Sequence, residues 1–232
     1  MLFSIITISL NNVNGLRKTV ESVLSQSGFD SVEYIIVDGN SNDGTKEYLL
    51  TLPKKIKWIS EKDSGISCAF NKGLKIASGD AVLFLNSGDT FCNEKSIETA
   101  TKDWIASKTD ILSYKVLVKE GLFIPMSDNQ KSIWEKCELP HQGTFVSRNV
   151  YTQIGGYSEE YRIRMDYHFF ARCRKAGFSF RYIPQIIANY EPGGVSMSEK
   201  NRMRFWREGM AVKMLYDLSF EAKDSMKFLL YH

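Results

Sequence analysis

The chain has 232 residues, 43% of them hydrophobic and 25% charged, which suffices to bury the core of one α/β domain or of two closely joined halves. Its formal net charge of +3 is too small to indicate a nucleic-acid groove, although it leaves room for a local basic patch. The four cysteines lie far apart without a Cys-x-x-Cys spacing, so a reducing compartment is favoured over a zinc site or a disulfide framework.

The first predicted element is a strand over residues 3–10. No basic residue precedes this apolar stretch, and it contains Ser4, Thr7 and Ser9, so it resembles neither a secretory signal nor a membrane span. Together with the cysteines, this predicts a cytoplasmic protein.

The following residues repeat the order strand, polar loop and helix. Apolar runs at 34–37 and 56–60 predict the second and third strands, and each strand is followed by a helical pattern. The helices are defined by Leu16, Val20, Val23 and Leu24, by residues 46–50, and by Ala69, Phe70, Leu74 and Ala77. Repeated β-α units predict an α/β fold with a Rossmann-like, mostly parallel sheet flanked by helices and with its polar loops at one edge.

Residues 81–85 are consecutive apolar residues and predict a fourth strand, covered on both faces. This strand runs directly into Asn86-Ser87-Gly88-Asp89. Ligands of open α/β sheets bind beyond the carboxyl ends of the strands, so Asp89 is placed to meet a cation or a polar ligand group. The alternative is that Asp89 only bonds the backbone of its own turn.

Neither a Gly-x-Gly-x-x-Gly dinucleotide motif nor a Walker loop is present. Four other motifs at predicted strand ends together resemble those of the family 2 glycosyltransferases. They are residues 4–12, residues 35–45, residues 61–66 with Asn71-Lys72-Gly73, and Leu85-Asn86-Ser87-Gly88-Asp89. The resemblance continues through residues 140–143, 155–157 and 165–167, and it is closest to bacterial exopolysaccharide and colanic-acid-type members.

This resemblance implies the A-type nucleotide-sugar fold (GT-A), as a single domain of two abutting halves. Residues 1–95 would bind the nucleotide sugar, residues 96–198 would bind the acceptor and carry catalysis, and residues 199–232 would form a basic helical segment. The implied activity is inverting transfer of a sugar from a nucleotide-diphosphate sugar to a hydroxyl of a saccharide or lipid-linked saccharide in cell-surface polysaccharide synthesis. A UDP-sugar is favoured as donor, and a GDP-sugar stays open.

On the donor side, Asp38 matches the family carboxylate that holds the base, and a carboxylate can accept a hydrogen bond from the uracil ring N–H. Asp63 matches a second nucleotide-side carboxylate. The other donor-side residues that the resemblance implies are Ser9, Asn11, Asn71 and Lys72. Local alternatives stay open, because Asp63 or Asn11 could cap the helix that follows it and Lys72 could lie on a solvated helix face.

Most members carry Asp-x-Asp where this chain has Asn86-Ser87-Gly88-Asp89. A divalent cation, Mg²⁺ or Mn²⁺, would then be held by Asp89, the donor phosphates and water, and would neutralise the departing diphosphate. The missing carboxylate keeps open a nucleotide-sugar-binding or scaffold protein without catalysis. A nucleotidyltransferase is a further alternative, but the Gly-rich basic loop that it would need after the first strand is absent.

The second half has a looser pattern. Its predicted elements are a helix with an apolar face at Ile97, Ala100, Thr101, Trp104 and Ile105, strands over 110–118 and 145–146, an irregular polar stretch over 120–131, an alternating strand over 178–190 and a lid-like loop over 191–196. His141, in the loop Pro140-His141-Gln142-Gly143, matches a family histidine that faces the donor phosphates or the acceptor. A lone histidine is otherwise more often structural.

A helix is predicted from Met165, and Asp166 lies at its start. Its predicted buried face consists of Phe169, Phe170, Cys173 and Ala176. The resemblance implies that Asp166 is the base that removes the proton of the acceptor hydroxyl, and desolvation would raise the pKa of its carboxyl. An N-cap role is the alternative. His168 would point elsewhere on the helix and is not paired with Asp166.

The tail, residues 199–232, is helical in pattern and basic through Lys200, Arg202, Arg204 and Arg207. These side chains could reach a diphosphate or the anionic inner face of the plasma membrane, or they could lie on a solvated helix face. The expected partners are therefore the sugar donor and the acceptor, with the membrane as a peripheral partner if these side chains reach it, and without nucleic acid.

Overall fold

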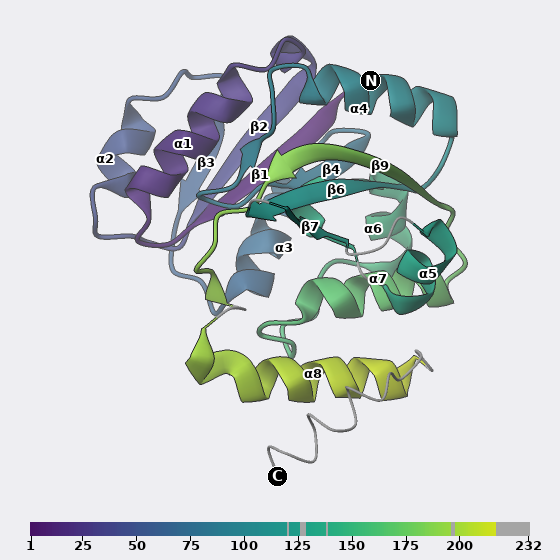
Figure 1. The fold of residues 1–232 in the computed structure, drawn as a ribbon. Helices are drawn as coiled ribbons and strands as arrows, with labels where there is room; N and C mark the ends of the chain where they lie inside the picture. The colour runs from purple at the N-terminus through teal and green to yellow at the C-terminus, as the bar shows by residue number, and fades with distance from the viewer. Residues whose placement is uncertain (120, 126–128, 138, 196–197, 217–232) are drawn as a thin grey trace.

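The computed structural model describes residues 1–119, 121–125, 129–137, 139–195 and 198–216 (Figure 1). These residues form one α/β domain around a nine-stranded sheet. The strands are β1 (Phe3–Ser9), β2 (Val32–Asp38), β3 (Lys57–Ser60), β4 (Ala81–Phe84), β5 (Thr90–Phe91), β6 (Ile111–Lys119), β7 (Leu122–Ile124), β8 (Thr144–Ser147) and β9 (Phe180–Asn189). The helices are α1 (Val13–Leu24), α2 (Thr45–Leu50), α3 (Ile66–Ile76), α4 (Ser96–Ser107), α5 (Gln130–Lys136), α6 (Arg148–Ile154), α7 (Met165–Lys175) and α8 (Arg202–Leu215), with 3-10 turns η1 (Phe29–Ser31), η2 (His141–Gly143) and η4 (Glu199–Asn201).

The strand order is β3-β2-β1-β4-β8-β6-β9-β5, and β7 pairs with β6. Strands β3, β2, β1 and β4 run parallel, as the repeated β-α units predicted. Strand β8 joins them antiparallel to β4 and connects to the second half through β6. One continuous sheet therefore links two abutting halves, and the predicted α/β class is confirmed.

The two faces of the sheet bury separate cores, because successive side chains of a strand point to opposite faces. Ile5 belongs to one core with Leu16 of α1, and Ile6 belongs to the other with Phe70 of α3 and Phe169 of α7. Helices α1 and α4 lie over one face, and α3, α6 and α7 lie over the other (Figure 1). This packing fixes the loops after β1 to β4 at one edge of the sheet.

Several details of the second half differ from the sequence predictions. The described part of residues 120–131 is not wholly irregular, since it contains β7 and the start of α5. Helix α6 was not predicted; it follows β8 directly, and the Ser147 hydroxyl caps it by accepting from the Asn149 N–H at 3.2 Å. Its apolar stripe was too short to stand out in the sequence.

The apolar faces of two predicted helices and the predicted alternation of one strand also need correction. Ile105 is 61% exposed on α4, and Ala176 is exposed because it lies just beyond the last turn of α7. Strand β9 does not alternate, since its register against β6 jumps from Ile183 to Ile186 around Pro184. Proline has no N–H for a ladder, and in sheets it is found at such irregularities.

The predicted helical tail is present as α8, which packs against α7. The rest of the predicted tail, residues 217–232, lies outside the described residues. Within the described part of the chain, no helix has both the length and the apolar character needed to cross a membrane.

Candidate active site

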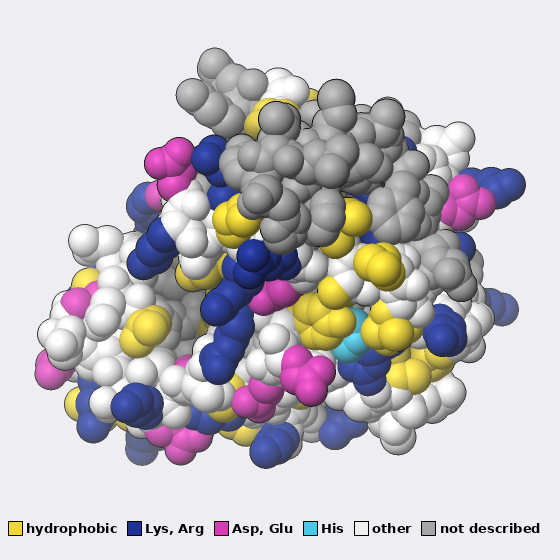
Figure 2. Space-filling view, turned by 90° about the horizontal axis from the view of Figure 1, so that it is seen from below, with side chains coloured by type: hydrophobic (Ala, Val, Ile, Leu, Met, Phe, Trp, Pro, Cys, Tyr) yellow, Lys and Arg dark blue, Asp and Glu magenta, His cyan; other side chains and the backbone are white. Residues whose placement is uncertain are grey.

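A pocket of about 440 Å³ lies beside the carboxyl end of β4. Its walls come from the turn after β4, from η2, from the start of α7, from the segment after β9 and from α8. Figure 2 views the molecule from the side on which α8 lies in Figure 1, where apolar, basic and acidic side chains are interleaved around a histidine. The pocket brings together four residues that the sequence singled out, Asn86, Asp89, His141 and Asp166.

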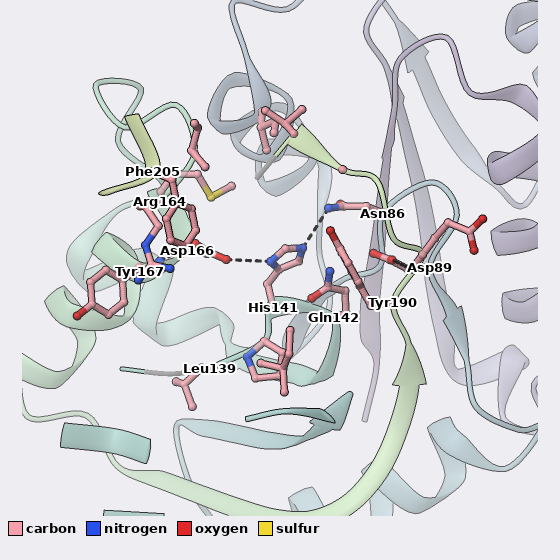
Figure 3. A pocket seen from close by; sticks show the side chains of 18 of the residues that line it. Asn86, Asp89, Leu139, His141, Gln142, Arg164, Asp166, Tyr167, Tyr190 and Phe205 are labelled. Atoms are coloured by element: carbon pink, nitrogen blue, oxygen red, sulfur yellow. Dashed lines mark hydrogen bonds and ion pairs between the residues drawn. The ribbon is translucent and has the colours of Figure 1, made fainter. Parts of the chain in front are cut away.

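Asn86, His141 and Asp166 form a hydrogen-bonded chain across this pocket (Figure 3). His141 Nδ1 lies 3.1 Å from Asp166 Oδ2, and His141 Nε2 lies 3.0 Å from Asn86 Nδ2. An amide nitrogen only donates, so Nε2 accepts and the proton on Nδ1 is donated to Asp166. Sequence patterns do not indicate this chain, because its members come from three separate segments.

Asp166 lies in the first turn of α7, where its Oδ1 accepts the Tyr167 N–H at 2.7 Å. The N-cap position belongs to Arg164, so the capping alternative for Asp166 is wrong. The Asp166 side chain is 26% exposed and is therefore accessible from the pocket. His168 points away from it and stacks on Tyr161, as its position on the helix predicted.

The pKa of the Asp166 carboxyl is lowered rather than raised. Burial raises this pKa, but the hydrogen bond from His141 and the nearby Arg164 cation outweigh burial. The expectation from desolvation alone is therefore wrong in direction, because it did not include His141. Asp166 is ionised at neutral pH and can accept a proton.

The start of α7 is held by Glu208 of α8. The Glu208 carboxylate accepts the backbone N–H groups of Arg162, Ile163 and Arg164 at 3.0, 2.9 and 2.9 Å. The side chain of the N-cap residue Arg164 makes no capping hydrogen bond. Glu208 instead supplies an acceptor for the backbone that leads into the helix. Helix α8 thereby fixes the backbone that leads into Asp166.

Asp89 is 3% exposed at the other side of the pocket. Its Oδ1 accepts the Glu191 N–H at 2.9 Å, so its carboxylate ties down the segment after β9 and does not merely bond its own turn. Burial raises the pKa of Asp89 to about 6, against the lowering effects of the Glu191 N–H, His141 and Gln142. A bound cation would favour its ionised form.

The residues around Asp89 fit a divalent cation that also binds a diphosphate. Within the described residues, no group of three His, Cys, Asp or Glu side chains is arranged to hold a metal ion. However, Asn86 Oδ1 is buried and finds no hydrogen-bond partner in this part of the chain. One carboxylate and one orphaned amide oxygen are oxygen ligands of the kind that Mg²⁺ and Mn²⁺ prefer.

The predicted donor-side residues do not line this pocket. Ser9, Asn11 and Asp38 lie at the carboxyl edge of the sheet, whereas Asn71 lies on α3 and lines a separate pocket. Ser9 and Asp38 are register partners at the ends of β1 and β2. Asp38 is fully buried and accepts from the Ser41 N–H at 3.1 Å and the Ser60 hydroxyl at 2.7 Å. The Ser9 hydroxyl is buried and has no hydrogen-bond partner among the described residues.

Asp63 and Lys72 form an ion pair of 2.6 Å beside this edge. Lys72 also contacts Glu61 at 3.0 Å and the Lys62 carbonyl at 2.9 Å, so it lies neither in the pocket nor on a solvated face. Asp63 does not cap α3, because the N-cap is Gly65 and has no side-chain hydrogen bond.

Asn71 and Asn11 both fasten loops. Asn71 donates to the Tyr157 carbonyl and accepts the Tyr157 N–H, each at 2.8 Å, and so joins α3 to the second half. Asn11 accepts the Asn42 N–H at 3.0 Å, whereas the cap of α1 is Asn12. The capping alternative for Asn11 is therefore wrong.

Sequence reasoning missed three residues of the site, Gln142, Arg164 and Glu208. Gln142 stands next to His141 in the loop that the sequence already marked, so its position was a usable signal. Arg164 and Glu208 had no local signal, because their roles depend on the packing of α8 against the start of α7.

Residues 4–180 match the family model described as Glycosyl transferase family 2. An uncharacterized glycosyltransferase of Mycobacterium tuberculosis is 35% identical over 186 residues, which cover 73% of this chain and 68% of that protein. A PGL/p-HBAD biosynthesis glycosyltransferase of the same species is 27% identical over 204 residues, covering 84% of this chain and 79% of the relative.

Two solved structures share the fold at low sequence identity. S. aureus TarS, residues 1–349, in complex with UDP-GlcNAc, aligns with a TM-score of 0.75 and 19% identity over 97% of this chain and 69% of that one. The mannosyltransferase PcManGT from Pyrobaculum calidifontis, in complex with GDP-Man and Mn²⁺, aligns with a TM-score of 0.72 and 14% identity over 95% and 65%. The expected A-type glycosyltransferase fold is confirmed.

Proposed function

Because this chain belongs to glycosyl transferase family 2, we propose that it moves a sugar, with inversion, from a UDP-sugar to a hydroxyl of a saccharide or lipid-linked saccharide acceptor in cell-surface polysaccharide synthesis. The observation that carries this proposal is the ionised carboxylate of Asp166, which is hydrogen-bonded to His141 in the same pocket as Asp89. The closer resemblance to exopolysaccharide and colanic-acid-type members stays a prediction.

Residues 1–95 are the donor half in this proposal, with Ser9, Asp38 and Asp63 at the nucleotide. The UDP-GlcNAc and GDP-Man complexes of the two structural neighbours support a nucleotide-diphosphate sugar as donor. The unpartnered hydroxyl of Ser9, beside Asp38, supports a ligand at this edge. Residues 96–198 bind the acceptor, and residues 199–232 form the basic segment.

In the reaction, an acceptor hydroxyl attacks the anomeric carbon of the donor sugar while Asp166 takes its proton. The new bond from the acceptor oxygen to carbon forms as the bond from carbon to the diphosphate oxygen breaks, and the electron pair leaves with UDP. His141 and the Tyr167 N–H each hold one oxygen of Asp166, so the carboxylate keeps its orientation throughout. A single displacement inverts the anomeric carbon and needs only this one base.

Asp89 and Asn86 Oδ1 would hold a divalent cation, Mg²⁺ or Mn²⁺, together with the donor phosphates. When bound, the cation supplies neutralisation of the charge on the leaving diphosphate. The Mn²⁺ in the PcManGT complex supports this proposal.

The test of the function is Asp166→Asn, assayed as transfer to an acceptor. Asparagine keeps the size of the side chain and loses the ability to take a proton, so turnover should fall roughly 10²–10⁴-fold with UDP-sugar affinity nearly unchanged. Transfer at the parent rate would refute Asp166 as the base. A protein that only binds nucleotide sugars would release no UDP at any rate, and a nucleotidyltransferase would release pyrophosphate.

We place the enzyme in the cytoplasm, with peripheral contact at the inner face of the plasma membrane. All four cysteines, which lie in the described residues, are free, and this supports a reducing compartment. Exposed Arg202, Arg204 and Arg207 on α8 support attraction to an anionic surface.

A further inference from the structure

The pocket has two unlike ends. Asn86 and Asp89 lie at one end, and Arg164 lies at the other beside the rings of Tyr167 and Phe205 (Figure 3). The hydrogen-bonded pair of His141 and Asp166 lies between them. An acceptor whose hydroxyl meets Asp166 can therefore extend toward Arg164 without crossing the Asp89 end.

Arg164 is packed by aromatic rings, and its charge acts on the nearby Asp166 without a direct ion pair among the described residues. Its guanidinium carbon lies 4.1 Å from the ring centre of Tyr167 and 4.4 Å from that of Phe205. Among the residues that the structure describes, no carboxylate forms an ion pair with this guanidinium, and its buried Nε has no hydrogen-bond partner. Because the rings cover the guanidinium faces and Nε is buried, the terminal Nη–H groups are the donors that a ligand would meet.

The other charged side chains of the described residues that line the pocket are carboxylates, so Arg164 is the residue there that can attract an anion. The carboxylates that line the pocket are Asp89, Asp166 and Glu191, whereas Arg164 is the single Lys or Arg side chain among the described residues that line it. A neutral ligand beside Arg164 would displace water from these donors without replacing the lost hydrogen bonds, which is costly. A carboxylate or a phosphate matches the guanidinium edge with two parallel hydrogen bonds.

We propose that Arg164, with Tyr167 and Phe205, forms an acceptor subsite for an anionic group, so that the preferred acceptor saccharide carries a carboxylate or a phosphate. This specificity rests on the proposed function, because it takes Asp166 as the point where the acceptor hydroxyl is placed. The aromatic rings supply apolar surface for the sugar, and Arg164 selects its charge.

The experiment uses two acceptor probes that differ by one charged group, 4-nitrophenyl β-D-glucuronide and 4-nitrophenyl β-D-glucoside. Their dissociation constants are measured by calorimetry on the UDP-loaded parent, on Arg164→Gln and on Arg207→Gln. Arg207 is an exposed residue of α8 that does not line the pocket, so its variant removes the same charge elsewhere. The parent should prefer the glucuronide roughly tenfold or more, as expected for a charge-assisted hydrogen bond.

Arg164→Gln should bring this preference close to one, whereas Arg207→Gln should keep it, and UDP affinity should stay unchanged in both. Equal binding of the two probes by the parent, or an unchanged preference in Arg164→Gln, would overturn the proposal. If Arg164→Gln weakened UDP binding and kept the preference, the cation would serve the donor diphosphate, which also overturns it.

A second measurement needs no variant and so does not depend on the folding of Arg164→Gln. Inorganic phosphate should displace the glucuronide from the parent protein without displacing UDP, and failure to compete would count against an anion subsite. Failure of the proposed function is distinguishable, because it would show as no release of UDP from any nucleotide sugar. The charge preference would still report on Arg164 in that case.

Discussion

The polar residues at the ends of β2 and β3 differ from those of the pocket in how completely the protein itself satisfies them. Asp38 accepts from Ser41 and Ser60, and Lys72 is paired with Asp63. In the pocket, by contrast, Asn86 Oδ1 and Arg164 Nε are buried without partners among the described residues. Unpaired buried polar atoms cost free energy that a ligand can recover. A ligand would therefore gain at Asn86 in the pocket and at the unpartnered Ser9 hydroxyl, whereas Asp38 and Lys72 already have partners within the protein.

Among the variants that test this comparison between the two regions, replacing Asp89 should have the largest effect. Asp89→Asn keeps an oxygen for the Glu191 N–H and removes the negative charge, so turnover should fall roughly a hundredfold or more and its stimulation by Mg²⁺ or Mn²⁺ should vanish. UDP release measured across a cation titration checks this. Because burial raises the pKa of Asp89 to about 6, the apparent cation affinity of the parent should also weaken below that pH.

The control is Asp110→Asn, since Asp110 is also a carboxylate that accepts a backbone N–H, from Ser179 at 2.9 Å, but lies outside the pocket. That variant should keep both turnover and the cation requirement. Full parent activity in excess chelator would contradict the role of Asp89 in holding a cation. The pocket would then no longer differ from the β2 and β3 ends by a cation site.

A smaller effect is expected at Asp38, at the end of β2, where the protein already supplies hydrogen-bond partners. Asp38→Ala should weaken UDP binding by about 1.5–3 kcal/mol, or roughly 10–150-fold, through loss of a charged hydrogen bond to the base. Ser41→Ala is the matched control, because it removes a donor to Asp38 but leaves the carboxylate in place. If calorimetry found equal UDP affinity in Asp38→Ala and in the parent, Asp38 would not bind the base. Its role would be limited to hydrogen bonds that hold the loop after β2.

The smallest effect is expected for His141→Gln, which removes the hydrogen bond to Asp166. It should change kcat/KM mainly at acidic pH. The hydrogen bond from His141 helps to keep the pKa of Asp166 below its ordinary value, so in His141→Gln burial should move this pKa upward. The base works when ionised, and the acidic limb of kcat/KM against pH should therefore move to higher pH. Activity at a fixed pH on that limb should fall roughly tenfold for each pH unit that the limb moves. If the acidic limb of the variant stayed at the pH of the parent limb, His141 would not set the pKa of the proposed base Asp166.

The sequence predicted the parallel half well, because its information is local. Strand β4 is a continuous apolar run, β1 and β2 are mostly apolar, and each of the three ends in a polar loop. Asp38 and Asp89 could be placed at the sheet edge from that alone. Asp166 was placed at a helix start for the same reason. These features need no knowledge of which loops meet.

The contacts within the site could not be predicted, because they join distant segments. His141 is 55 residues from Asn86 and 25 from Asp166, and no pattern within either interval indicates the pairing. The predicted direction of the change in the Asp166 pKa was wrong for the same reason. Likewise, no sequence pattern indicated that Lys72 forms ion pairs. Its contacts with Glu61 and Asp63 depend on how the loop before α3 folds.

Helix α8 makes the boundary of the family match a poor place to cut this chain. The matched region ends at residue 180, yet Glu208 binds the three backbone N–H groups just before Asp166. A chimera that grafted only the matched region onto another scaffold would carry Asp166, the proposed base, without the carboxylate that secures its backbone. The smallest portable unit of the proposed site therefore includes α8, which carries Glu208 and ends at Leu215.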